Sequence, residues 1–127
     1  MLTADSFLFE MKSFYDLQVW HKAHALTLQV YRCTTEFPSN ELYGLTSQTR
    51  RASASIGANL AEGCGYSNDA DFARYCVIAL GSASELEYHL LLAKDLKLLK
   101  TKHYTDLTAQ TQEVKRMLTS LIQTLKK

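Results

Sequence analysis

Four stretches of the chain place an apolar residue at every third or fourth position, and short polar segments separate them. The pattern is most regular in the last stretch, where the inward positions alternate three and four apart: Tyr104, Leu107, Thr111, Val114, Leu118, Leu121 and Leu125. This spacing gathers the apolar side chains on one face of an α-helix. It predicts helices over about 17–35, 45–62, 69–96 and 102–125.

Residues that begin and end helices stand between these stretches. Asp16 is predicted to cap the first helix, and Ser67 or Asn68 the third, because their side chains can accept hydrogen bonds from free amides of a first turn. Gly63 and Gly65 are predicted to stop the second helix, where a positive φ is easy for glycine.

Four amphipathic helices with short connections predict an all-α fold, an up-down-up-down antiparallel four-helix bundle. The bundle is expected to span residues 14–127 as one domain, after an N-terminal lead-in of residues 1–13. A chain of 127 residues is long enough to bury a core.

The second predicted helix has two stripes at helical spacing. One is small or apolar (Leu45, Ala52, Ile56, Leu60 and Gly63), and the other is polar (Gln48, Arg51, Ser55, Asn59 and Glu62). A helix with both stripes is expected to pack on more than one side. Gly57 costs about 1 kcal/mol relative to alanine in mid-helix, so we expect another backbone to approach closely there.

The polar stripe has two interpretations. It can form one hydrogen-bonded network with the third helix, because a buried arginine must be paired and such networks fix register or subunit geometry. The residues of this structural network or subunit interface are Gln48, Arg51, Ser55, Asn59, Glu62, Ser82 and Glu85. The alternative is a ligand or nucleic-acid site.

The formal charge of +1 gives no global argument for nucleic-acid binding. However, the first and last connections of such a bundle meet at one end, where basic residues exceed acidic ones. The candidate phosphate contacts there are Arg50, Arg51, Lys97, Lys100 and Lys102. A single copy would bind weakly, whereas several copies in a ring would strengthen the local field. The alternative is a solvated face.

Motifs for catalysis, cofactors and metals are absent. There is no phosphate-binding glycine loop, HExxH or paired CxxC, and Glu85 with His89 lacks the partners of a di-iron site. Cys33, Cys64 and Cys76 are expected to be free, reduced thiols. We therefore expect no catalytic residues, no metal, no cofactor and no enzyme activity. With no signal peptide and no run of about 18 apolar residues, a cytoplasmic protein without a membrane partner is expected.

Several segments together resemble a known family: VW, FP-x-x-E-x-YGL-x-x-Q-x-RRA, S-I-x-A-N-x-AEG and GS-x-x-E-L, over about residues 15–99. The chain resembles the bacterial four-helix-bundle proteins encoded by intervening sequences inside large-subunit ribosomal RNA genes, also described as ribosomal-protein-like. The resemblance implies assembly as a homopentameric ring. That family is similar to the accessory variability protein of diversity-generating retroelements, which binds a reverse transcriptase and nucleic acid.

Two functional hypotheses follow. The first is a non-enzymatic, homo-oligomeric scaffold that binds RNA or DNA weakly through its basic residues. The second is an adaptor for a protein partner with no nucleic-acid role, such as a reverse-transcriptase accessory protein, with the helix of residues 44–65 as the subunit interface.

Overall fold

Four long helices make up the computed structural model of the protein, which describes residues 13–127. They are α2 (Gln18–Thr34), α3 (Ser47–Gly63), α4 (Asp69–Asp95) and α5 (Thr101–Leu125). The 3-10 turn η1 (Phe14–Asp16) precedes α2, and the turns η2 (Ser39–Glu41) and η3 (Leu42–Thr46) lead into α3. The predicted all-α four-helix fold is confirmed. Of the predicted lead-in, residues 1–12 lie outside the described part of the chain.

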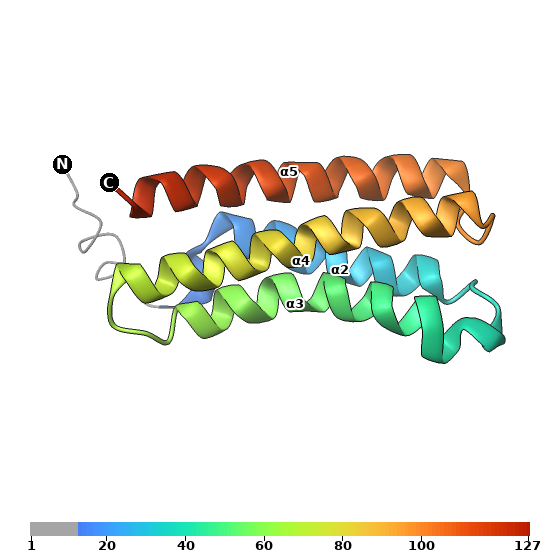
Figure 1. Ribbon diagram of the computed structural model, residues 1–127, viewed down its shortest axis with the longest axis horizontal. Helices are drawn as coiled ribbons and strands as arrows, with labels where there is room; N and C mark the ends of the chain where they lie inside the picture. The colour runs from blue at the N-terminus through green and yellow to red at the C-terminus, as the bar shows by residue number, and fades with distance from the viewer. Residues whose placement is uncertain (1–12) are drawn as a thin grey trace.

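Consecutive helices run in opposite directions and lie side by side (Figure 1). The α2–α3 and α4–α5 connections therefore lie at the same end of the bundle, called the basic end below. The α3–α4 connection and the C-terminus lie at the other end. The basic end is the right-hand end in Figure 1.

The core runs along the bundle axis and takes side chains from all four helices. Its largest fully buried members are apolar and follow the predicted spacing: Leu26, Val30, Ile56, Leu60, Phe72, Leu86, Leu90, Leu107, Val114 and Leu118. Burying one such side chain stabilises the fold by roughly 1.5–3 kcal/mol. Thr49 and Thr111, also fully buried, satisfy their hydroxyls by donating to backbone carbonyls one turn earlier.

Close approach between α3 and α4 occurs at Gly63. A Cβ atom there would lie 2.8 Å from the Cβ of Tyr75 and 3.0 Å from Cδ1 of Phe72. Gly57 differs from the prediction, because a Cβ there would meet Nε1 of the Trp20 indole at 3.3 Å rather than another backbone. The prediction for Gly57 was therefore wrong in its cause: a side chain of α2 occupies the neighbouring space.

The hydrogen bonds confirm one predicted helix cap and correct another. Asn68 caps α4, since its Oδ1 accepts from the amide of Asp71 at 2.8 Å. Asp16 does not cap α2, which begins after Leu17 without a side-chain cap. Asp16 instead accepts from the amide of Ser13 at 3.1 Å and closes η1.

Candidate functional site

The turn between α4 and α5 contains a lysine in an unusual backbone conformation. Lys97 has φ 64°, the one positive φ among the non-glycine residues described, and no described glycine has a positive φ. α3 ends at Gly63 as predicted, but neither Gly63 nor Gly65 has the positive φ that was given as the reason. At Lys97 the amide donates to the carbonyl of Lys94, and the amide of Leu98 donates to that of Ala93, both at 2.9 Å. This pattern is a Schellman motif, whose left-handed position is usually glycine.

This turn and the first turn of α5 together expose three of the five predicted basic residues. Lys97, Lys100 and Lys102 are all exposed, and none forms an ion pair with another described residue. Lys94 differs, because its Nζ lies 3.8 Å from Asp95 and 4.7 Å from the centre of the Tyr104 ring. Three positive charges in these two turns are thus available to an anion.

The other two predicted basic residues lie near the start of α3 and differ from each other. Arg50 is half-buried and bridges α3 to α2: its Nε donates to Thr34 Oγ1 at 2.8 Å, and its guanidinium lies 4.8 Å from the centre of the Tyr31 ring. Arg51 is exposed and has no hydrogen bond or ion pair with the described residues. Arg50 is therefore committed to helix packing, whereas Arg51 faces solvent.

Part of the predicted polar network comes together between α3 and α4. The hydroxyls of Ser55 and Ser82 lie 2.9 Å apart. The Asn59 Nδ2 donates to the Ser55 carbonyl at 2.8 Å and to its hydroxyl at 3.0 Å. This small cluster joins two helices and contains no charged group, so it fixes their register rather than supplying chemistry.

The remaining members of the stripe do not join this cluster. Gln48 and Arg51 are exposed. Glu85 pairs with His89 on its own helix, Oε2 to Nε2, at 3.7 Å. Glu62 contacts Tyr75, and the Tyr75 hydroxyl lies 3.0 Å from that of Tyr66. The pKa of Tyr75 is raised to about 12, mainly by the hydrogen bond with Tyr66 and further by partial burial and by Glu62.

A face of α4 that points away from the bundle is unusually apolar. Val77, Ile78, Tyr88 and Leu91 are exposed there; we call them the α4 outer face. By length and composition α4 could cross a membrane, a property that core helices of globular proteins share. In its most apolar stretch of 18 residues, 39% of the residues are buried inside the bundle. The packed side of α4 builds the core, and the outer face has no partner within the described chain. The apolar periodicity did not predict this outer face, because it identifies only the residues that point into the core.

A groove runs between α2 and α3 and begins at the basic end. Its first section, about 750 Å³, is lined by Tyr31, Tyr43, Arg51 and Ala54 among others. The second, about 460 Å³, shares Tyr31 and Ala54 and continues to Trp20. Neither section has an acidic lining residue among those described. Tyr31 and Tyr43 were not predicted as surface residues, although their positions outside the apolar seams would have indicated it.

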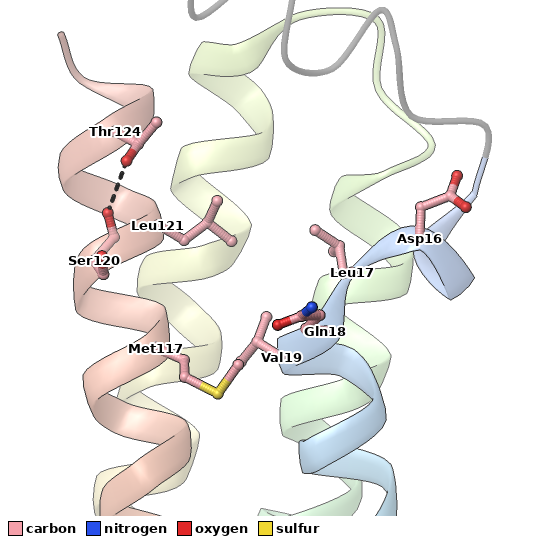
Figure 2. A pocket seen from close by; sticks show the side chains of 8 residues that line it. All are labelled: Asp16, Leu17, Gln18, Val19, Met117, Ser120, Leu121 and Thr124. Carbon is pink, nitrogen blue, oxygen red and sulfur yellow. Dashed lines mark hydrogen bonds between the residues drawn. The ribbon is translucent and has the colours of Figure 1, made fainter.

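A smaller crevice of about 340 Å³ lies between the start of α2 and the end of α5. Figure 2 shows Val19 and Met117 approaching each other across it, with Leu121 on the α5 side and Asp16 at its rim. Thr124 donates to the carbonyl of Ser120 at 3.1 Å. The crevice is mainly apolar, with one carboxylate at its edge.

The described cysteines are free, and two are buried enough to hold their protons strongly. Burial raises the pKa of Cys76 to about 12 and that of Cys64 to about 11. A thiol with a raised pKa is a poor nucleophile at neutral pH. Within residues 13–127, no three His, Cys, Asp or Glu side chains group as metal ligands.

Comparison with known proteins identifies the family of the chain. The model of the family described as 23S rRNA-intervening sequence protein matches residues 15–120. The chain is similar to the crystal structure of a protein with unknown function from the S23 ribosomal protein family of Bacteroides thetaiotaomicron VPI-5482. The identity is 27% and the TM-score 0.75, over 84% of this chain and 99% of that one. A search of curated proteins finds no match. The relation to the retroelement accessory protein stays a prediction.

Proposed function

We propose, from the premise that the chain belongs to the 23S rRNA-intervening sequence protein family, that it is a non-enzymatic, homo-oligomeric scaffold that binds nucleic acid through its basic end. The single observation that carries this proposal is the α4–α5 turn. It presents Lys97, Lys100 and Lys102 to solvent without ion-pair partners among the described residues. It also holds Lys97 at a position where glycine would be more stable.

The charge distribution supports the same end. Residues 32–51 and 94–106, which form the basic end, contain seven lysines and arginines against four aspartates and glutamates. At the opposite end, residues 13–18, 62–74 and 120–127 contain four acidic residues against three lysines and arginines. The molecule is thus nearly neutral in total but positive at one end, so phosphate would be attracted there.

Self-association is proposed because the α4 outer face would otherwise leave large apolar side chains in water. Exposed apolar side chains gathered on one helix can mark an interaction site. A homopentameric ring, which the family resemblance implies, would cover this face and bring several basic ends together. Each added phosphate contact releases counterions, so a weak interaction per copy would grow with the number of copies.

The test is the salt dependence of binding to a fluorescently labelled structured RNA, followed by anisotropy. The test variant carries Lys97→Gln, Lys100→Gln and Lys102→Gln. Binding by the unaltered protein is expected to weaken steeply with salt. The variant is expected to bind more weakly at low salt, with a slope of log K against log salt that is shallower by about two to three.

A matched control removes three positive charges elsewhere: Arg116→Gln, Lys126→Gln and Lys127→Gln, all exposed on α5 or just after it. Both variants have the same net charge, so a difference between them reports position. Equal losses in both would mean that only the total charge matters and would refute the basic end as the site. Absence of any binding at low salt would refute the nucleic-acid function itself.

A further inference from the structure

We propose that the groove between α2 and α3 takes up unpaired nucleotides, so that the nucleic acid bound at the basic end is single-stranded RNA or an RNA loop. This inference rests on the proposed function and specifies its ligand. The groove opens at the basic end, because Tyr43 and Arg51 near the start of α3 line its first section. An RNA strand held there by its phosphates would thus have a cavity beside it.

The size of the groove suits nucleotides. Ligand cavities commonly measure about 300–1,000 Å³, and the two sections, about 750 and 460 Å³, each fall in that range. Small residues, Ala54 and Ala58, are shared by both sections and keep the floor low. From Ser47 to Ala61 the α3 wall is about 21 Å long, so the groove can accept more than one nucleotide.

The aromatic residues of the groove suit bases. Tyr43 is 93% exposed, and its ring makes no aromatic or cation contact among the described residues, so both ring faces are available. Tyr31 is 43% exposed, with Arg50 over its ring. Deeper in the groove the Trp20 ring is already covered by His24, whose centroid lies 4.9 Å away, and by Phe14 at 4.6 Å, so Tyr43 is the free stacking platform. Proteins that bind single strands combine such stacking platforms with basic residues.

The charge of the groove distinguishes this ligand from an apolar partner. Arg50 and Arg51 line the first section, and no carboxylate lines either section of the described groove. A strand with bases on the tyrosines would keep its phosphates near Arg51, at the same end of the bundle as the lysines of the α4–α5 connection. The exposed hydroxyl of Ser47 on the same wall can bond a ribose 2′-hydroxyl, which is why we propose RNA rather than DNA.

The experiment compares Tyr43→Ala with Tyr66→Ala by anisotropy at low salt. Tyr66, at the α3–α4 connection, is 39% exposed and serves as the matched control, because it lies outside the groove and outside the α4 outer face and is not part of the core. The probes are a labelled uridine oligomer of about 12 nucleotides, the same oligomer in deoxy form, and an RNA duplex of equal length. Tyr43→Ala is expected to weaken uridine-oligomer binding about five- to tenfold and duplex binding less than twofold. Tyr66→Ala is expected to leave both unchanged.

Several results would overturn the inference while leaving the proposed function in place. One is equal binding of duplex and single strand with no effect of Tyr43→Ala, while the triple-lysine variant still loses affinity. Another is a change in native mass with Tyr43→Ala and unaltered RNA binding, which would assign the groove to a contact between copies. Tighter binding of the deoxy oligomer would overturn the choice of RNA. Failure of all three probes to bind would remove the proposed function as well.

Discussion

Replacing Lys97 with glycine separates the role of this residue in folding from its role in binding. At φ 64° a residue with a Cβ atom is disfavoured by roughly 1–2 kcal/mol relative to glycine. Glycine loses more backbone entropy on folding, which offsets about 0.5–1 kcal/mol of that gain. Lys97→Gly is therefore expected to raise the free energy of unfolding by about 0.5–1 kcal/mol. For a chain of this size the melting temperature would rise by about 2–4 °C.

The same substitution removes one proposed phosphate contact. RNA affinity at low salt is expected to fall severalfold, and the slope of log K against log salt to become shallower by about 0.7–0.9. The matched control is Lys97→Gln, which removes the same charge but keeps a Cβ atom in the left-handed conformation. Both variants should bind equally weakly, and only the glycine variant should be more stable.

Urea unfolding followed by circular dichroism, together with anisotropy titrations at several salt concentrations, would measure both effects. A glycine variant less stable than the unaltered protein would refute the assignment of backbone strain to Lys97. A glycine variant that is more stable and binds RNA with unchanged affinity would refute its role in phosphate contact.

Three further predictions concern packing, self-association and pH. Gly63→Ala should lower the free energy of unfolding by about 1–3 kcal/mol, because its Cβ would lie 2.8 Å from that of Tyr75. Gly81→Ala, with no atom within 4 Å, should raise the free energy of unfolding by about 0.5–1 kcal/mol in the same urea assay. The reverse order of stabilities would contradict the packing at Gly63. Val77→Glu should reduce the mass measured by light scattering to that of a monomer while helicity is kept, whereas an unchanged mass would exclude Val77 from the subunit contact. The pKa of Cys76 is raised from 9.0 to about 12, so the unfolded chain loses this proton first and the free energy of unfolding should fall as pH rises from about 9 towards 12. Cys76→Ala should remove about 1–2 kcal/mol of the fall between pH 8 and 10.5. An identical pH profile for the variant would contradict the burial of this thiol.

The fold was predictable because one local rule governs most of it. The apolar spacing placed each helix within a few residues of its observed bounds, since only one face of each helix enters a core built along a single axis. The same rule could not locate Lys97 as the residue with positive φ. That conformation depends on how α4 must end to turn back along the bundle, and glycine propensity pointed to Gly63 and Gly65 instead.

The candidate site was only partly accessible from sequence. Helix topology was enough to bring the α2–α3 and α4–α5 connections together and to place the lysines at one end. It could not show that Arg50 packs on Tyr31 or that Arg51 is exposed, because these adjacent residues differ only in the direction of their side chains. The groove was also not predictable, since its shape depends on how the side chains of two helices pack against each other.

The central claim, an oligomer that binds RNA, is tested most directly by native mass measured with and without a structured RNA at low salt. The expected mass is at least twice 14.4 kDa, a whole-number multiple of the mass of one chain, and it increases by the mass of the RNA when RNA is added. A species of 14.4 kDa whose mass does not change with RNA would contradict both parts of the claim.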